Sequence, residues 1–351
     1  MHTINHALKP LALTMGDACG IGPEIIVQLW LDAAVPQAAL VVACPQVMRR
    51  ALAWVVRARG LTRAPAIVEL LDPTQWASAA AGSIPVWAPP GLPTDLMEAP
   101  LGQVDVRAGR AAAACVRAAV RLAQEGVVAG IVTAPLHKEA LSLAGEPYPG
   151  HTELLQAEGA PPGQPPAPVR MMLANEQLKT VLVTIHMSLR QAIECVTFDA
   201  VLETIRITHA SARLWGVSQP RIAVAGLNPH AGEGGLFGDE EIRIIGPAVE
   251  AARALGIHTT GPLAPDTVFM RARDASDHPG EFDVVVAMYH DQGLIPVKYL
   301  GLDQGVNVTL GLPFVRTSPD HGTAFDLAGT GRADPSSLGQ AWRMARQLLA
   351  A

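Results

Sequence analysis

Residues 106–135, VRAGRAAAACVRAAVRLAQEGVVAGIVTAP, join a long helical pattern to a short apolar run. Residues 106–126 predict the strongest helix of the chain, which ends at Gly126. Residues 127–135 predict a buried strand directly after that helix. A helix that leads into a buried strand is typical of α/β proteins, so this stretch favours that fold class.

The same alternation continues on both sides of this stretch. Strands are predicted at 11–14, 39–44, 169–175, 180–186, 221–230 and 283–290, and helices at 23–33, 46–59, 200–215 and 239–255. Strands separated by helices predict mostly parallel sheets with helices on both faces. Two segments rich in proline, 72–105 and 159–168, are expected to be connections.

Length and composition narrow the class of protein. The 351 residues exceed the usual size of one hydrophobic core and predict two domains. The net charge of -6 argues against a nucleic-acid partner. No apolar run is long enough to span a bilayer, and the N-terminus lacks a signal-peptide pattern. The four cysteines contain no CxxC pair and favour reduced thiols, so we expect a cytoplasmic protein without a membrane partner.

Three histidines fall at or just beyond the carboxyl ends of predicted strands: His186, His230 and His290. Ligands of open α/β sheets bind at these ends. Neutral imidazole is the commonest ligand for a divalent transition metal, and a set of three leaves coordination positions open for a substrate. A single histidine after a strand is more often a hydrogen-bonded loop residue, and the wide spacing here gives no local motif. Position alone therefore leaves both interpretations open.

A second set of polar residues could bind an anion. His151 and Thr152 begin a predicted helix, and Lys298, Asn307 and Arg316 lie further along the chain. A lysine, an amide and an arginine that converge on one ligand suit a phosphate or a carboxylate. Each residue taken singly is more often a helix cap or a solvated surface group.

Two glycine-containing loops complete the candidate sites. MGDACGIGPE (15–24) joins a strand to a helix but lacks the GxGxxG pattern of a Rossmann fingerprint, so a tight turn is the alternative. The segment from His321 through Gly322, Thr323 and Ala324 to Asp326 could wrap an adenosine, or could be a capped helix entry.

With these residues assembled, the chain resembles the 4-hydroxythreonine-4-phosphate dehydrogenase family from about Leu11 to Leu338. The shared stretches are TMGDACGIGPEI, TAPLHKEAL, YPGHTELL, TIHMSLR, GLNPHAGEGGLFGDEE, GPLAPDTVF, AMYHDQGLIPVKYLG and GVNVTLGLPFVRTSPDHGTAFDLAG. Several are long and unusual. One loop departs from the family, which has proline after the acidic residue where this chain has Ala18 in Asp17-Ala18-Cys19-Gly20.

The resemblance implies a two-domain α/β/α fold like that of isocitrate and isopropylmalate dehydrogenases, with the active site in the interdomain cleft. Residues 1–138 and 297–351 are expected to form a cofactor-binding domain, and residues 139–296 a central domain with the metal ligands and the dimer interface. The implied cofactors are NAD, or NADP, and one divalent metal per site (Zn, Co, Mg, Mn or Ni). The implied partner is a second copy of the chain, which shares the active sites.

Carried across by motif, the resemblance assigns roles to the candidate residues. The metal ligands are His186, His230 and His290; the substrate residues are His151, Thr152, Lys298, Asn307 and Arg316; the cofactor residues are His321, Gly322, Thr323, Ala324 and Asp326. Asp266, Lys138 or the neighbouring His137 would relay protons, or would be caps or surface groups.

The implied reaction is oxidation of a phosphorylated four-carbon 3-hydroxy acid, followed by decarboxylation of the 3-keto acid. The metal would lower the pKa of the substrate hydroxyl, and nicotinamide would accept the hydride. The motifs look closest to the branch that acts on 4-phospho-D-threonate and 4-phospho-D-erythronate. Two alternatives stay open: a dehydrogenase of the same family acting on a cis-dihydrodiol such as that from terephthalate, and a binding protein that kept the fold without the activity.

Overall fold

The structure is a computed structural model of the chain. It describes residues 9–32, 38–161, 163–213, 216–276, 278–301 and 304–350. Within these ranges no helix is both long and apolar enough to cross a membrane. The chain folds into two compact units, which are described separately below. The first unit comprises residues 1–167 and 312–346, and the second comprises residues 168–311 and 347–351.

These boundaries differ from the expected ones at 138/139 and 296/297. Residues 139–167 belong to the first unit because α4 (Lys138–Leu143) and α5 (His151–Gly159) pack against the long helix α3 (Val106–Gln124). Residues 297–311 belong to the second unit because β11 (Val306–Leu310) pairs with β6 (Arg170–Ala174). Whether the units carry the expected division of cofactor and metal binding stays a prediction.

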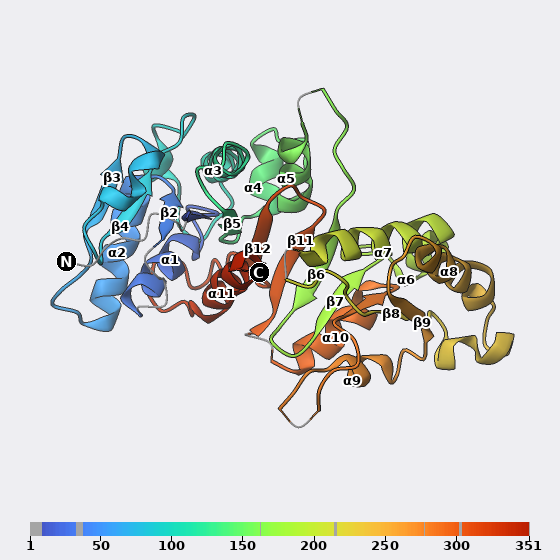
Figure 1. Ribbon diagram of the computed structural model, residues 1–351. Helices are drawn as coiled ribbons and strands as arrows, with labels where there is room; N and C mark the ends of the chain where they lie inside the picture. Colours follow the sequence, from blue (N-terminus) through green and yellow to red (C-terminus); the bar gives the residue numbers. More distant parts are fainter. Residues whose placement is uncertain are drawn as a thin grey trace. The chain divides into compact units, whose positions relative to one another are not determined.

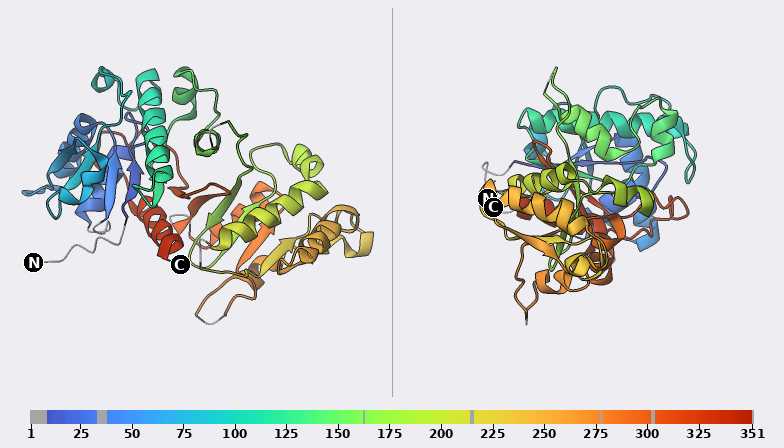
Figure 2. Two further views of the ribbon diagram at one scale, coloured as in Figure 1. Left: turned by 45° about the horizontal axis from the view of Figure 1, so that its top comes forward. Right: turned by 90° about the vertical axis from the view of Figure 1, so that its right-hand side faces the viewer.

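The first unit contains six strands in the order β3-β4-β2-β1-β5-β12, and every neighbouring pair is parallel. The strands are β1 (Leu11–Thr14), β2 (Ala39–Val42), β3 (Ile67–Leu70), β4 (Ile84–Trp87), β5 (Gly130–Thr133) and β12 (Val315–Pro319). Its other helices are α1 (Gly22–Leu31), α2 (Pro45–Arg59) and α11 (Ser336–Ala350, which runs past the unit boundary at 346). Figures 1 and 2 show α3 standing beside these strands, and it packs on β1 and β5.

Local chemistry explains why this unit forms as the sequence predicts. All four residues of β1 are fully buried, as a central parallel strand requires. The helix α3 begins where the Asp105 carboxylate accepts a hydrogen bond from the Arg107 backbone N–H at 2.8 Å. The helix α2 ends at Gly60, whose φ of 62° is left-handed. These caps fix the ends of the helices and so direct the loops at the strand ends.

The second unit contains six strands in the order β11-β6-β7-β10-β8-β9. The additional strands are β7 (Lys179–Leu182), β8 (Ile222–Ala225), β9 (Thr259–Leu263) and β10 (Val284–Ala287). The β11–β6 and β6–β7 pairs are antiparallel, and the pairs among β7, β10, β8 and β9 are parallel. The helices are α6 (Leu189–Cys195), α7 (Phe198–Ala212), α8 (Gly246–Ala254), α9 (Val268–Ala272) and α10 (His290–Tyr299). The mostly parallel α/β class is therefore confirmed.

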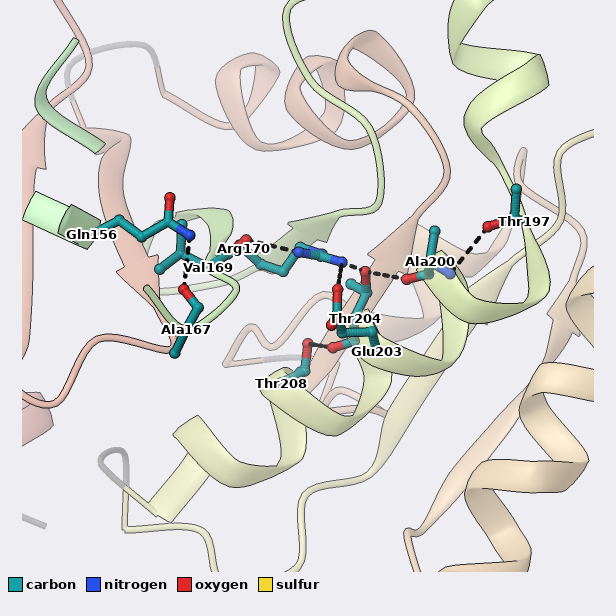
Figure 3. Close-up of polar contacts among 9 residues, drawn as sticks. All are labelled: Gln156, Ala167, Val169, Arg170, Thr197, Ala200, Glu203, Thr204 and Thr208. Carbon is teal, nitrogen blue, oxygen red and sulfur yellow. Dashed lines mark hydrogen bonds and ion pairs between the residues drawn. The ribbon is translucent and has the colours of Figure 1, made fainter. Parts of the chain in front are cut away.

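A partly buried polar cluster joins α7 to the sheet of the second unit (Figure 3). The Arg170 guanidinium, at the start of β6, donates from Nε to Thr204 Oγ1 at 2.7 Å and from Nη2 to Glu203 Oε2 at 2.6 Å. Thr197 caps the start of α7 by accepting from the Ala200 backbone N–H at 3.2 Å. These contacts to two residues of α7 help to fix where α7 lies on the sheet.

Several predicted elements differ in detail from the structure. The segment 72–105, expected to be a connection, contains β4. This strand has only four residues, one of them Pro85, and so gives little strand pattern. The expected helix 239–255 starts with a π-helical turn, Glu241–Ile245, before α8. The expected strand 283–290 stops at Ala287, and His290 is the first residue of α10. The strands β3, β9, β11 and β12 were also not predicted.

Candidate active site

His186 and His290 lie close together in the second unit. His186 follows β7 and His290 follows β10, and these strands are parallel neighbours. Their ring centroids are 5.5 Å apart, with the planes tilted by 45°. Both residues line a pocket of about 520 Å³, together with Thr184, Met187 and Tyr289. The structure therefore brings two of the three predicted ligands to one place.

The donor set and its geometry fit a divalent metal. Two imidazoles that share an ion through nitrogens about 2.1 Å from it would have centroids roughly 5 Å apart. The Nδ1 atom of His290 lies 2.7 Å from Asp291 Oδ1. Such a carboxylate fixes the ring and leaves Nε2 available to a metal. The site is also open, since His186 is exposed and His290 is half-buried.

His230 occupies an unusual backbone segment. It lies at the start of the turn Pro229–Gly235, with φ of 53°, and Ala231 and Glu233 also have positive φ. Left-handed conformations at non-glycine residues cost about 1–3 kcal/mol each and are concentrated at functional sites. The His230 side chain is exposed, and its ring centroid lies 6.2 Å from that of Phe237.

Two side chains hold the segment that precedes His230. The buried Glu241 carboxylate accepts hydrogen bonds from the backbone N–H groups of Leu227 at 2.7 Å and Asn228 at 2.8 Å. Gln292, two residues after His290, donates from Nε2 to the Gly226 carbonyl at 2.8 Å. The loop that carries His230 is thus tied to the segment that carries His290.

The three histidines do not form one cluster in this chain. Across residues 9–350, apart from the gaps given above, no group of three or more His, Cys, Asp or Glu side chains could hold a metal ion. The pair His186–His290 is observed, and the participation of His230 stays a prediction.

A buried arginine and a histidine lie together in the first unit. Arg316 on β12 is only 3% exposed, and its Nη2 donates to Thr133 Oγ1 at 2.7 Å on the neighbouring strand β5. Burial lowers the pKa of Arg316 to about 10, and Glu153 opposes that shift, so the guanidinium stays charged at neutral pH. A buried charge of this kind favours an anionic ligand.

His151 begins α5 beside this guanidinium. Burial lowers the pKa of His151 well below its ordinary value of 6.5, and the Arg316 charge lowers it further. Its Nε2 atom is buried without a hydrogen-bond partner among the described residues. A neutral imidazole next to a guanidinium can donate one hydrogen bond to an anion without a second charge. The predicted anion-binding role of these two residues therefore has a physical basis.

The other predicted substrate and proton residues are spread over both units. Thr152 follows His151 on α5; Lys298 is in the last turn of α10; Asn307 is on β11, opposite Leu173. All three are half-buried, whereas Asp266 and Lys138 are exposed. Their predicted roles are untested by these positions.

The predicted cofactor segment packs on the first glycine-containing loop within the first unit. The Ile21 backbone N–H donates to the Thr323 carbonyl at 3.0 Å. A Cβ atom at Gly20 would lie 2.9 Å from Thr323, so only glycine fits there. His321, Gly322 and Asp326 are exposed, and Ala324 has a left-handed φ of 42°. The segment is a shaped loop with exposed polar groups, as a ligand-binding loop requires.

The departure in this loop is compensated locally. Asp17 Oδ1 accepts a hydrogen bond from the Cys19 backbone N–H at 2.8 Å, which closes the turn where the family has proline. The Asp17 side chain is fully buried, and burial raises its pKa from 3.8 to about 6. His137 is close enough to oppose this shift, and its ring stacks on Phe325 at 4.9 Å. No role was predicted for Asp17, although an acidic residue in the loop after a buried strand was a usable signal.

We expect Asp17 to make stability depend on pH. Because its folded-state pKa of about 6 lies above the ordinary 3.8, the folded chain binds this proton more tightly than the unfolded chain. Through this group the free energy of unfolding falls as pH rises from about 4 to about 6 and stays lower above that range. Asp17→Asn keeps the Oδ1 acceptor and should remove the fall, on the order of 2 kcal/mol. The free energies of unfolding of wild type and Asp17→Asn are measured in urea at pH 4 and pH 7. If the two proteins differ by the same amount at both pH values, the prediction is contradicted.

Comparisons with known proteins identify the family of the chain. Residues 36–345 match the family model described as pyridoxal phosphate biosynthetic protein PdxA. The 4-hydroxythreonine-4-phosphate dehydrogenase of Beijerinckia indica is 54% identical, over 97% of this chain and 95% of that protein. The D-threonate 4-phosphate dehydrogenase of Pectobacterium atrosepticum is 45% identical, over 97% and 99%.

A solved structure gives the same result for the fold. The crystal structure of 4-hydroxythreonine-4-phosphate dehydrogenase from Klebsiella pneumoniae superimposes with a TM-score of 0.87 at 44% identity, covering 99% of this chain and 100% of that one. The family resemblance drawn from the sequence is therefore confirmed. The chain belongs to the pyridoxal phosphate biosynthetic protein PdxA family and is a dehydrogenase.

Proposed function

We propose that this dehydrogenase oxidises a phosphorylated four-carbon 3-hydroxy acid, with NAD as acceptor and a divalent metal at the histidines. The substrate would be 4-hydroxythreonine 4-phosphate, 4-phospho-D-threonate or 4-phospho-D-erythronate, followed by decarboxylation of the 3-keto acid. The observation that supports this most is the His186–His290 pair, with rings 5.5 Å apart in an open pocket. The names of the similar enzymes support the substrate class.

Each group of residues has a separate task in this proposal. When bound, the metal would lower the pKa of the substrate hydroxyl and the nicotinamide would accept hydride. His186 and His290 would hold the metal, and Asp291 keeps the His290 ring in place. Arg316 and the neutral His151 would bind an anionic group of the substrate. Lys298, Asn307 and Thr152 would supply further polar contacts.

The remaining residues concern the cofactor and the proton. The exposed loop with His321, Gly322 and Asp326 would contact the adenosine part of NAD or NADP. Asp266 or Lys138, both exposed, would take the proton released from the substrate hydroxyl.

We also propose that the functional unit is a homodimer with shared active sites. Large apolar side chains are exposed directly beside the predicted ligands: Met187 and Leu189 follow His186, and Leu236 and Phe237 follow His230. A grouping of exposed apolar residues next to a polar site is typical of an interface. Sedimentation velocity should give the mass of two chains; a stable, fully active monomer contradicts this part.

A substrate panel tests the proposed activity. NADH absorbance is followed with 4-hydroxythreonine 4-phosphate, 4-phospho-D-threonate, 4-phospho-D-erythronate, unphosphorylated D-threonate and the terephthalate cis-dihydrodiol, all with added divalent metal. We expect a phosphorylated acid to have the highest kcat/KM, by about two decades over D-threonate, because one charge-assisted contact is worth about 1.5–3 kcal/mol. A higher kcat/KM for the dihydrodiol would contradict the proposal, and no turnover at all would favour a binding protein.

A further inference from the structure

A second pocket lies at the other edge of the second-unit sheet. Its volume is about 400 Å³, and its walls include residues that precede strands rather than follow them: Lys179 begins β7, Arg221 precedes β8 and Asp283 precedes β10. The histidines follow β7 and β10. Because the strands are parallel, this pocket and the histidine pocket are at opposite ends of the same strands.

Lys179 is the one lysine that lines this pocket. Its side chain is half-buried, and apolar groups of Val217, Ala272 and Phe282 form part of the wall. The structure shows no hydrogen bond or ion pair within contact distance for its ammonium group among the described residues. Lys179 is thus a half-buried, cavity-lining amine near two carboxylates, those of Asp283 and Asp274.

The charged neighbours of Lys179 are largely committed elsewhere. Asp283 accepts from the Arg221 backbone N–H at 2.7 Å, from Arg221 Nη2 at 2.7 Å and from Nε at 3.2 Å, so both carboxylate oxygens are paired. Asp274 Oδ1 accepts from the Gly280 backbone N–H at 3.3 Å. Gln177, which also lines the pocket, accepts at Oε1 from Arg273 Nε at 2.7 Å.

These surroundings change the acidity of the amine. Burial lowers the pKa of Lys179, and the charges of Asp283 and Asp274 oppose that shift without cancelling it. At neutral pH Lys179 is thus more often a neutral amine than an exposed lysine is. A neutral, desolvated lysine amine is a nucleophile for carbonyl carbon.

We propose that this pocket is a covalent binding site for small aldehydes or keto acids, with Lys179 Nζ as the nucleophile. The amine adds to the carbonyl carbon to give a carbinolamine, and one N–H proton moves by way of Asp274 or water to the oxygen. The C–O bond then breaks, the hydroxyl leaves as water together with the second N–H proton, and an imine remains between Nζ and the carbonyl carbon. No electron is gained or lost. The 400 Å³ cavity admits a compound of two to four carbons, and its wall combines apolar groups with charged and amide side chains.

The proposal does not depend on the dehydrogenase activity, because it uses none of the histidines. The chain has only four lysines, Lys9, Lys138, Lys179 and Lys298, so each can be followed separately. Full-length protein is incubated with glyoxylate and sodium cyanoborohydride, which reduces an imine to carboxymethyl-lysine. Peptide mass spectrometry then gives the extent of modification at each position between pH 6 and pH 9.

We expect Lys179 to be modified at least fivefold faster than the exposed Lys9 and Lys138 at pH 7, with half-maximal rate at a lower pH. The preference should disappear in urea, where all four lysines are equally solvated. The variant K179R should lose the pocket modification and keep its dehydrogenase kcat/KM, which separates this test from that of the proposed function. Modification of Lys179 no faster than that of Lys9 in the folded protein would overturn the proposal. If K179R fails to fold, the comparison of folded and urea-treated wild type still decides.

Discussion

Replacing His290 with alanine is expected to remove the bound metal and to lower kcat by about a thousandfold or more. A metal contributes several kcal/mol to transition-state stabilisation, and each 1.4 kcal/mol is a factor of ten in rate. His290 is the better test residue of the observed pair, because its Nδ1 atom already has a partner, Asp291, at 2.7 Å. The fold should persist, since His290 is only half-buried at the start of α10 and fills no core position.

The controls separate loss of metal from loss of structure. His258→Ala removes an exposed histidine far along the chain from the pair and should change neither metal content nor kcat. Asp291→Asn keeps the imidazole but weakens its orientation, and should lower metal affinity about 10- to 100-fold. Metal content is measured by mass spectrometry of the dialysed proteins. One metal ion per chain in His290→Ala, with wild-type kcat, would contradict the assignment.

The second large effect is expected from Arg316. Arg316→Ala should raise KM for a phosphorylated substrate by about 10- to 100-fold, because a charge-assisted hydrogen bond is worth roughly 1.5–3 kcal/mol. KM for unphosphorylated D-threonate should change less, if the guanidinium contacts the phosphate. Arg316→Lys keeps the charge and loses the planar fork, so it should recover only part of the affinity.

A matched control separates a role of Arg316 in substrate binding from a role in stability only. Thr133→Val removes the Oγ1 atom that accepts from Arg316 Nη2 at 2.7 Å and leaves the guanidinium in place. If Arg316 binds substrate, Thr133→Val should raise KM only slightly while Arg316→Ala raises it strongly. A variant whose free energy of unfolding in urea is lower than that of wild type acts at least partly through stability. An unchanged KM in a folded Arg316→Ala protein would show that Arg316 does not contact the substrate.

The sequence predicted the parts of the site that depend on strand ends. His186 and His290 follow neighbouring parallel strands, and parallel strands bring their carboxyl ends to one edge. Such relations follow from periodicity and from the order of strands and helices. Arg316 and Thr133 also lie on paired strands, but β12 was not predicted, so this contact could not be foreseen. The family resemblance then supplied roles that spacing could not.

Other features depend on contacts that no local pattern reveals. The left-handed backbone at His230 is held by Glu241 and Gln292, which lie 11 and 62 residues further along the chain. The acidity of Asp17 depends on its burial beside His137, and the Lys179 pocket depends on segments near 221, 274 and 283. The strand β4 was hidden because Pro85 weakens its pattern. Tertiary packing decides each of these, and it is not encoded in any one window of the sequence.

One measurement tests the central claim, that the histidines hold a catalytic metal, most directly. The initial rate of NADH formation from 4-phospho-D-threonate or 4-hydroxythreonine 4-phosphate is measured on chelator-treated protein, before and after addition of Zn, Co, Mg, Mn or Ni. We expect the rate to be lost on chelation and restored by at least one of these metals in wild type, and not restored in His290→Ala. An undiminished rate in thoroughly chelated wild-type protein would contradict the claim.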